Sequence, residues 1–532
     1  MTSEPTRRHV LEALSGLLLA LFVATLSSTV VSTALPRMIG DLHGSQAQFT
    51  WVVTATLLTA TASTPIWGKL ADLFSKKALI QGAIAVFVAG SIAAGLSQSA
   101  GQLIASRALQ GAGVGGLQAL VQIAIAAMIP PRERGRYSGY ISSVTALATI
   151  GGPLLGGLIV DTSWLGWRWC FFIGVPVAAA ALLLLQLTLR LPAVRRDDVK
   201  IDYLGAILIT AGVSVLLIWI SFVDDAFAWA SWQTAVMVGG SLAVLVLAGW
   251  VETRAAEPVV PLGIVRQRAT ALAILGSLAA GTAMYGAAVF LSQYFQISRD
   301  HTPTEAGLLT IPMMVGILIA SLVAGRLITR SGRLKPFIVT GAVALTTGFA
   351  VLSVIDDRTS LILMGAAMFL VGAGVGMTMQ NFVLVVQNAV PLRDIGAASS
   401  TVAFFRSLGG TIGVSVLGAV LARQVSERVT DGLTAAGLPA SGGQGQGGSL
   451  NVDALPAAVQ EIVRAAYGDA TGYVFLLSAA VALLGVLAAV LLKPVTLRTS
   501  LDLSDSIKAA AVGADAADGA PAVDQVSVEP VK

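Results

Sequence analysis

The sequence predicts an all-α membrane protein with fourteen transmembrane helices. Of its 532 residues, 55% are hydrophobic and only 12% are charged, and the mean hydropathy is +0.81. A soluble globular chain carries roughly 25% charged residues, so these charges are too few to cover a water-exposed surface. A soluble enzyme, a disordered scaffold and a nucleic-acid-binding domain are all disfavoured by this composition.

Fourteen apolar runs are long enough to cross a bilayer, whose hydrocarbon core of about 30 Å needs roughly 20 residues of helix. Helices satisfy their own backbone groups in lipid, and the runs lack the alternation of barrel strands. The first run is too long for a cleavable signal, and no small-residue cleavage site follows it. The runs span about 11–34, 51–68, 78–98, 102–128, 139–160, 169–190, 203–223, 232–251, 270–296, 305–325, 336–355, 360–385, 397–420 and 471–492.

The Lys and Arg residues predict how the chain is oriented, because cytoplasmic loops are enriched in them. With the N-terminus in the cytoplasm, 24 of the 33 Lys and Arg residues fall in cytoplasmic segments and seven fall outside. The remaining two, Arg107 and Arg406, lie inside predicted spans. We therefore expect a multi-pass protein of the cytoplasmic membrane with both termini in the cytoplasm. The net charge of +4 reflects this topology, and no nucleic-acid partner is expected.

The chain contains too few soft ligands for a metal centre. Cys170 is its one cysteine, and its three histidines, His9, His43 and His301, are far apart in the sequence. A disulfide framework and a Cys-built metal site are excluded on this basis. No Walker-type nucleotide-binding loop is present either. We expect no metal and no other cofactor.

Two weakly similar halves can be recognised in the sequence. Gly68–Lys77 is similar to Gly325–Arg333, Gly111–Gly115 to Gly372–Gly376, and Gly151-Gly152 to Gly409-Gly410, at nearly constant offsets. Repeated halves with a site between them are typical of transporters. The predicted parts are a cytoplasmic N-terminus (1–10), a six-helix bundle (11–190), a linker with two additional helices (191–269), a second six-helix bundle (270–492) with an extracellular loop (421–470), and a disordered cytoplasmic tail (493–532).

Five short motifs lie along the spans. They are Gly68-Lys69-Leu70-Ala71-Asp72 with Lys76-Lys77, Arg107-Ala108-Leu109-Gln110-Gly111, Gly152-Pro153 with Gly156-Gly157, Trp167-Arg168-Trp169, and Arg406-Ser407-Leu408-Gly409-Gly410. Together they resemble the motifs of the major facilitator superfamily, in its fourteen-helix drug:proton antiporter branch. The resemblance covers about residues 11–492. It implies two six-helix bundles plus two extra helices, alternating access, and proton-driven export of drugs, antibiotics or related organic compounds.

Several charged residues are candidates for gating and proton coupling. Asp72 stands at the cytoplasmic end of a helix, where charge-assisted bonds to nearby Lys or Arg would hold that side closed. Leu73 and Ser75 depart from the family pattern, which usually has a basic residue and a Gly at these positions. Arg107 and Arg406 lie within spans, and a charge there is costly and tends to be functional. Structural hydrogen bonding is the alternative for both arginines.

Polar side chains on otherwise apolar helices are candidates for a large, weakly polar substrate cavity. Bonding between helices is the alternative for each residue taken singly. The candidates are Thr25, Ser28, Thr29, Ser32, Gln110, Gln118, Gln122, Tyr285, Gln293, Tyr294, Gln380, Asn381 and Gln387. The motif Gly152, Pro153, Gly156 and Gly157 predicts close helix packing and a kink.

The expected proton carrier is missing from the first helix. Drug antiporters of this branch usually carry an Asp there, whereas this chain reads Leu26-Ser27-Ser28-Thr29. No Asp or Glu lies deep in any predicted span. Asp224, Asp225 and Glu305, at membrane ends, remain as candidates, with solvated loops or helix starts as the alternative. Without a buried acid, neutral or anionic cargo is favoured over cationic cargo.

The expected partners are the lipid bilayer, protons and a small amphipathic organic substrate, and the chain is expected to be a monomer. Two other functions stay open at this point. One is uptake or facilitated diffusion of a metabolite without proton coupling, which the missing acids favour. The other is transport of lipid or cell-envelope components, or a non-transporting scaffold, for which the predicted extracellular loop is the argument.

Overall fold

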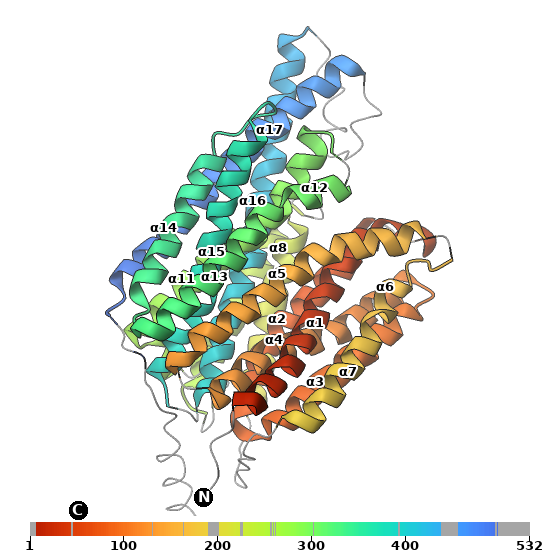
Figure 1. The fold of residues 1–532 in the computed structure, drawn as a ribbon. Helices are drawn as coiled ribbons and strands as arrows, with labels where there is room; N and C mark the ends of the chain where they lie inside the picture. The colour runs from red at the N-terminus through yellow and green to blue at the C-terminus, as the bar shows by residue number, and fades with distance from the viewer. Residues whose placement is uncertain are drawn as a thin grey trace, which may run out of the picture.

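The protein is a bundle of long helices (Figure 1). The computed structural model describes residues 7–189, 202–437 and 456–497, except for 44–45, 130, 163, 224–226, 256–257, 259, 261, 302, 392–393 and 495–496. Within these ranges no β-strand is formed, and the all-α prediction is confirmed. The linker 191–201, the Gly-rich stretch 441–448 and the tail beyond 497 lie outside the described residues.

The helices form two similar sets and an insert between them. The first set comprises α1 (Arg7–Asp41), α2 (Gln46–Leu73), α3 (Lys76–Gly95), α4 (Ala100–Met128), α5 (Pro131–Asp161), α6 (Trp169–Phe172) and α7 (Gly174–Thr188). The insert comprises α8 (Tyr203–Phe222) and α9 (Trp232–Glu252), followed by the short α10 (Leu262–Val265). The second set comprises α11 (Arg268–Gln293) with the π turn η1 (Tyr294–Ser298), α12 (Pro303–Leu309), α13 (Ile311–Ser331), α14 (Lys335–Leu352), α15 (Leu361–Ala389), α16 (Ile395–Ala435) and α17 (Ala457–Leu491).

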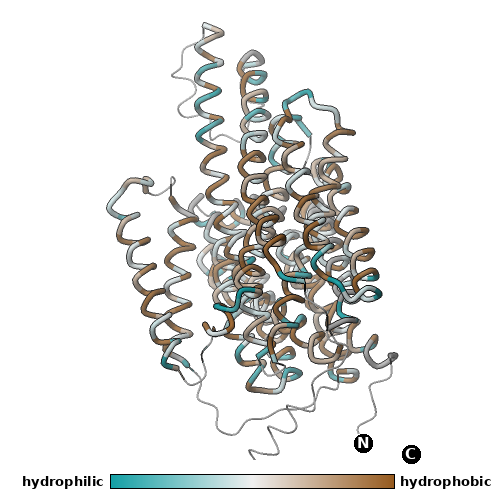
Figure 2. Tube along the Cα trace, turned by 90° about the vertical axis from the view of Figure 1, so that its left-hand side faces the viewer, coloured by the Kyte–Doolittle hydropathy of each residue, from teal (hydrophilic) through white to brown (hydrophobic). Residues whose placement is uncertain are grey.

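Eleven of the described helices are long and apolar enough to cross a membrane (Figure 2). The apolar part of α8, Leu204–Ile220, is shorter, and α2 and α5 are not among the eleven. The figure of fourteen spans therefore stays a prediction. We call the side where α1 begins and α2 ends the near end, at the bottom of Figure 1, and the opposite side the far end.

Serine side chains fix where several helices begin. Ser75, Ser99 and Ser231 each accept a hydrogen bond from a backbone N–H in the first turn of α3, α4 and α9. These caps satisfy donors that the helix itself leaves unpaired. At the near end of α13, Gly332 adopts a left-handed conformation, with φ of 69°, which glycine allows without strain.

Glycine triplets pack the central helices of both sets in the same way. In Gly111–Gly115 of α4, the outer glycines lie against α2 and the middle one lies against Phe87 of α3. In Gly372–Gly376 of α15, the outer glycines lie against α13 and the middle one lies against Leu345 of α14. A Cβ at these positions would overlap the neighbouring helix, so the triplets allow close backbone approach. The equivalent packing supports the predicted internal repeat.

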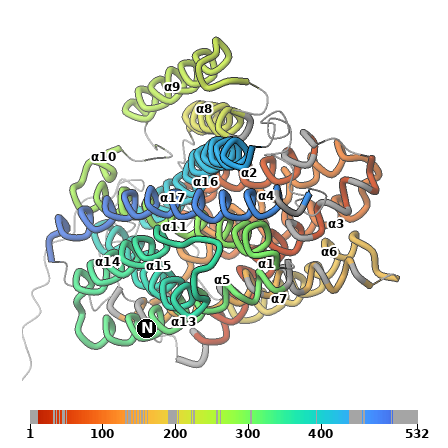
Figure 3. The backbone as a smooth tube through the Cα atoms, turned by 90° about the horizontal axis from the view of Figure 1, so that it is seen from above, coloured from red at the N-terminus to blue at the C-terminus, as the bar shows by residue number. Residues whose placement is uncertain are grey.

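The insert packs on the outside of the junction between the two halves. Helix α8 lies against α2 and α16, where its Leu217 shares an apolar cluster with Leu58 and Phe404. Helix α9 packs on α8, and the Ser241 hydroxyl donates to the Gly212 carbonyl over 2.8 Å. Seen from above, α8 lies between α9 and the main bundle (Figure 3). Most of the α9 surface is exposed, as expected for a lipid-facing helix.

In the described part of 421–470, two helices stand where the sequence predicted a long loop. Helix α16 continues to Ala435, and α17 already begins at Ala457, so the two form a hairpin that projects at the far end (Figure 1). Val425 and Val429, one turn apart on α16, are buried in the same apolar cluster as Val463 of α17. Apolar residues at this helical spacing face the partner helix, and polar residues cover the outer faces of both helices. The many polar residues are the reason why the sequence was interpreted as a solvated loop.

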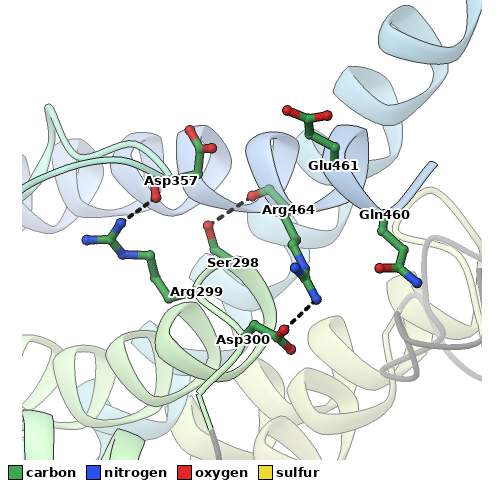
Figure 4. Close-up of a pocket in the computed structure, with 7 residues that line it drawn as sticks. All are labelled: Ser298, Arg299, Asp300, Asp357, Gln460, Glu461 and Arg464. Atoms are coloured by element: carbon green, nitrogen blue, oxygen red, sulfur yellow. Dashed lines mark hydrogen bonds and ion pairs between the residues drawn. The ribbon is translucent and has the colours of Figure 1, made fainter. Parts of the chain in front are cut away.

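Polar contacts fasten this hairpin to the loops beneath it. A pocket of about 420 Å³ lies between them (Figure 4). Its lining residues are Ser298, Arg299, Asp300, Asp357, Gln460, Glu461 and Arg464. Arg464 forms an ion pair of 2.8 Å with Asp300, and the Ser298 hydroxyl donates to the Arg464 carbonyl over 2.9 Å. These bonds hold the hairpin against the second helix set.

Candidate functional site

The clearest polar contact between the two halves is made by Asp72 at the near end. Its two carboxylate oxygens accept hydrogen bonds from the backbone N–H groups of Gly396 and Ala397, each over 2.8 Å. These donors belong to the first turn of α16, where a helix leaves its N–H groups unpaired and carries a partial positive charge. The last turn of α2 is thereby joined to the first turn of α16.

Glycine makes this approach possible. A Cβ on Gly396 would overlap the Asp72 carboxylate and the Gly68 carbonyl, and a Cβ on Gly68 would overlap Ser400. The sequence predicted that Asp72 closes this side, but expected side-chain cations as its partners. Lys69 and Lys76 do lie close enough to interact electrostatically with the carboxylate. The hydrogen bonds, however, come from the start of α16.

A second contact between the halves is made by Arg134, which sequence reasoning treated only as part of a basic loop. Its guanidinium donates to the carbonyls of Ala126 and Ile129, over 2.6 and 2.7 Å, at the end of α4. It also donates to the side-chain carbonyl of Gln387 on α15 over 3.2 Å. Gln387 in turn donates to the Ser399 hydroxyl of α16 over 2.9 Å. We call this set the Arg134 network.

The Arg134 network changes the interpretation of Gln387. This residue was expected to line a cavity, whereas its side chain is 6% exposed and joins three helices at the near end. In the sequence, nothing separates Arg134 from Arg132 and Arg136 beside it. Its own burial, at 3% exposed, and its bond to Gln387 are features that only the fold reveals.

Arg107 and Gln110 lie inside the first half rather than between the halves. The Arg107 guanidinium donates to the Gln110 side-chain carbonyl. The Gln110 amide donates to Ser27 of α1 over 3.0 Å and to Ser91 of α3 over 2.8 Å. This cluster ties three helices together, because a buried amide stays favourable only when its donors and acceptors are paired.

Further along α4, the other two predicted glutamines differ in exposure. Gln118 is partly exposed, whereas Gln122 is buried at 7% exposed and its side-chain oxygen has no partner among the described residues.

The hydroxyl groups of Thr25, Ser28 and Thr29 on α1 form hydrogen bonds within the protein. Thr25 and Ser28 donate to the carbonyls one turn earlier in their own helix. Thr29 also donates to the Ala148 carbonyl of α5 over 3.1 Å. Its hydroxyl lies where a Cβ on Gly152 would stand. The side chain of Ser32 lies outside the described residues.

In the motif Gly152-Pro153 with Gly156-Gly157 on α5, the two described glycines serve helix packing. Gly152 is buried against Thr29 of α1, and Gly156 is also buried. Pro153 and Gly157 stand within α5, which runs unbroken from Pro131 to Asp161, and their side-chain environment lies outside the description.

Three more of the predicted cavity residues, all in the second half, have buried side chains. Tyr294 is fully buried, and its hydroxyl donates to the Asp356 carbonyl over 2.7 Å. Asn381 is 4% exposed and donates to the Met377 carbonyl one turn earlier. Gln380 is 7% exposed. Gln293 and Tyr285 keep partial exposure and remain open to a ligand.

Arg406 is buried in α16 next to Tyr285 of α11. Its side chain is 4% exposed, and its Nη1 atom has no hydrogen-bond partner among the described residues. Arg107 also has an unpartnered Nε atom, but its Nη1 atom donates to Gln110, and the Arg134 guanidinium donates to three acceptors.

Among the remaining acidic candidates, Glu305 is the one that the structure describes. Glu305 stands in the first turn of α12, with 56% of its side chain exposed, 3.4 Å from His301. Asp224 and Asp225 lie outside the described residues.

The chain was compared with known proteins. Residues 17–414 match the family model described as Major Facilitator Superfamily. An uncharacterized MFS-type transporter of Mycobacterium tuberculosis is 34% identical over 504 residues, which cover 94% of this chain and 72% of the relative. The multidrug transporter protein MdtP of Bacillus subtilis is 33% identical over 420 residues, covering 79% and 77% of the two chains. The efflux pump dotC of Dothistroma septosporum is 30% identical over 501 residues, covering 93% and 85%.

A solved structure agrees at the level of the fold. The proton:xylose symporter XylE, bound to 6-bromo-6-deoxy-D-glucose, superposes with a TM-score of 0.59 at 14% identity, covering 91% of this chain and 95% of XylE. The two glycine-packed halves and the family match agree with each other, and the matched relatives are transporters and efflux pumps rather than enzymes. The chain is a multi-pass membrane transporter that belongs to the major facilitator superfamily.

Proposed function

We propose that this transporter exports drugs or related amphipathic organic compounds from the cytoplasm in exchange for protons. The observation that carries the proposal is the contact of Asp72 with Gly396 and Ala397, which joins the halves at the near end. Alternating access needs a contact of this kind, which holds one side closed and can be released. The relatives named as a multidrug transporter and an efflux pump support the direction of transport.

In this proposal the near end faces the cytoplasm, as its Lys and Arg residues predict. The conformation described here is then closed to the cytoplasm by the Asp72 contact and the Arg134 network. Toward the far end the two helix sets diverge (Figure 1), as expected for a state open to the outside.

Protonation of Asp72 offers a link between the proton gradient and this closure. The carboxylate accepts two N–H bonds at the positive end of α16, and a protonated acid is a weaker acceptor there. Losing the negative charge would favour separation of α2 from α16. Proton entry from one side and release to the other would then bias which end is open.

Cargo would bind between the halves. We propose the partly exposed Gln118, Gln293 and Tyr285 as contacts, because the other polar candidates are largely engaged within the protein. A few polar groups among apolar helices suit amphipathic compounds of varied shape.

Flux into proteoliposomes tests this function. The purified full chain would be reconstituted, the lumen made acidic, and uptake of tetramethylrhodamine with a free carboxylate followed by fluorescence, with protein-free liposomes as the control. We expect dye movement that collapses when an ionophore removes the pH gradient. Dye movement that does not depend on the gradient would overturn proton coupling. It would instead support facilitated diffusion, which the absence of Asp and Glu deep in the predicted spans favours.

A further inference from the structure

A buried cation without a partner stands in the middle of the membrane-spanning part of α16. Arg406 lies eleven residues after the start of this helix at Ile395, or roughly 16 Å along its axis. Its side chain is 4% exposed, and its Nη1 atom is buried and unbonded. Among the described residues, its guanidinium takes part in no hydrogen bond and no ion pair.

Two glycines, one on α11 and one on α16, allow these helices to pack closely around Arg406. Arg406 and Gly410 are one turn apart on α16, and Gly281 and Tyr285 are one turn apart on α11. A Cβ on Gly281 would overlap the backbone carbonyl of Arg406 and lie 3.2 Å from its Cγ atom, and a Cβ on Gly410 would overlap the Tyr285 ring. Gly281 thus lets the backbone of α16 approach α11 at Arg406, and Gly410 makes room for the Tyr285 side chain.

Tyr285 completes the polar environment of this site. Its phenol lies close enough to interact electrostatically with the Arg406 guanidinium. The phenol keeps partial exposure although it stands in the middle of a transmembrane helix. A small molecule can therefore reach the tyrosine that lies beside the unpaired arginine.

Among the described residues, no carboxylate pairs with this charge. Of the helices that pack on α16, α4, α8, α11 and α15 contain no Asp or Glu. The acids of α2 and α17 lie toward helix ends, with Asp72 beside Gly396 and with Glu461 and Asp469 in the far-end hairpin. The first acidic residue after Arg406 on α16 is Glu427, roughly 30 Å further along the helix. A buried charge is normally paired, and an intramembrane charge that is not paired marks a ligand pathway.

We propose that Arg406 and Tyr285 bind an anionic oxygen, such as a carboxylate, on the amphipathic cargo. The inference rests on the proposed export function and specifies its substrate class. The guanidinium presents a planar fork that binds a carboxylate through two parallel hydrogen bonds, and the phenol can donate a third. Anionic or zwitterionic compounds then bind more tightly than their esters or permanently cationic relatives.

Equilibrium binding of a matched dye pair tests this site. Tetramethylrhodamine with a free carboxylate and its methyl ester differ in that group alone. Fluorescence polarisation with the purified full chain in nanodiscs should show tighter binding of the acid by roughly tenfold, as expected for charge-assisted hydrogen bonds. Arg406→Gln should remove this preference by weakening binding of the acid far more than binding of the ester, and Arg406→Lys should keep part of the preference. Tyr285→Phe should reduce it to a smaller extent.

Ester binding serves as the folding control within each variant, and Arg358→Gln, at a side chain that is 80% exposed, serves as the charge-matched control. Equal binding of both dyes by the unmodified chain would overturn the proposal. A preference that survives Arg406→Gln, or a loss of both dyes in Arg406→Lys, would also overturn it. Because no pH gradient is applied, failure of gradient-driven flux would contradict proton-coupled export but leave this binding result unaffected.

Discussion

Asp72 and Gly396 are 324 positions apart in the chain, yet the Asp72 carboxylate accepts the backbone N–H of Gly396 over 2.8 Å. One residue ends a helix of the first half, and the other begins a helix of the second half. The contact needs no side chain on α16, because the donors are those that every helix start leaves unpaired. The strength of the contact therefore depends on the negative charge of Asp72 and on the absence of a side chain at Gly396.

Removing the charge of Asp72 should shift the protein toward a conformation open at the near end. Asp72→Asn keeps the size of the side chain but loses hydrogen bonds to a charged group, each worth about 1.5–3 kcal/mol. In a Cys170→Ala background, the accessibility of a single cysteine introduced at the near end to a membrane-impermeant thiol reagent would measure the shift. Asp431→Asn, at an exposed position of the far-end hairpin, is the matched control and should leave accessibility unchanged. Equal labelling of both variants would contradict the role of Asp72.

Gly396→Ala should disrupt the same contact without changing any charge. The new Cβ would overlap the Asp72 carboxylate and the Gly68 carbonyl, so α2 and α16 must move apart. Gly418→Ala on the same helix meets open space and is the control. Dye flux should fall strongly in the first variant and stay near normal in the second. Similar flux in both would show that close approach of α2 and α16 is not required.

The Arg134 network predicts energetic coupling between residues of the two halves. Arg134→Gln, Gln387→Ala and the double variant should give non-additive losses of stability, with a coupling of roughly 0.5–3 kcal/mol. Thermal unfolding in detergent, monitored by tryptophan fluorescence, would measure it. Arg358→Gln combined with Gln387→Ala should be additive, because the Arg358 side chain is exposed at the far end. Additivity in the Arg134 pair would contradict the network.

The neighbouring glycines of the fifth-helix motif should differ in their tolerance of a side chain. A Cβ on Gly152 would overlap the Thr29 hydroxyl, whereas a Cβ on Gly151 would lie at an ordinary 3.6 Å from Leu26. Gly152→Ala should therefore lower thermal stability and flux much more than Gly151→Ala. Thr29→Gly should partly rescue Gly152→Ala, because it removes both the hydroxyl and the Cβ that the new side chain would overlap. Equal effects of both glycine substitutions would contradict this packing.

Periodicity, composition and short repeated motifs predict the helices and the repeated halves, because these follow from local hydropathy and recurring sequence. The closing role of Asp72, which the family resemblance implied, stays a prediction. The partners of Asp72 were predicted less well, since backbone N–H groups carry no signature in the sequence. Arg134 was missed for a related reason. Two further arginines, Arg132 and Arg136, lie close to it in the chain, and the sequence gives no sign that Arg134 is buried and bonded to the second half.

The predicted cavity residues show a further limit of sequence reasoning. A polar residue on an apolar helix faces either a cavity or another helix, and helical spacing is the same in both cases. Gln110 and Tyr294 pack within one half and form hydrogen bonds there. The hairpin at 421–470 was taken for a loop because its exposed faces are polar, although its buried Val and Leu positions keep a helical period.

The most direct test of alternating access measures both ends of one sample. In a Cys170→Ala background, spin-label pairs would be placed at Phe74 and Arg333 for the near end, and at Leu96 and Val354 for the far end; these positions are exposed. Distances would be recorded by pulsed electron resonance with Asp72 intact and as Asp72→Asn. The account predicts that Asp72→Asn lengthens the near-end distance and shortens the far-end distance. Distances that stay constant, or that change in the same direction at both ends, would contradict it.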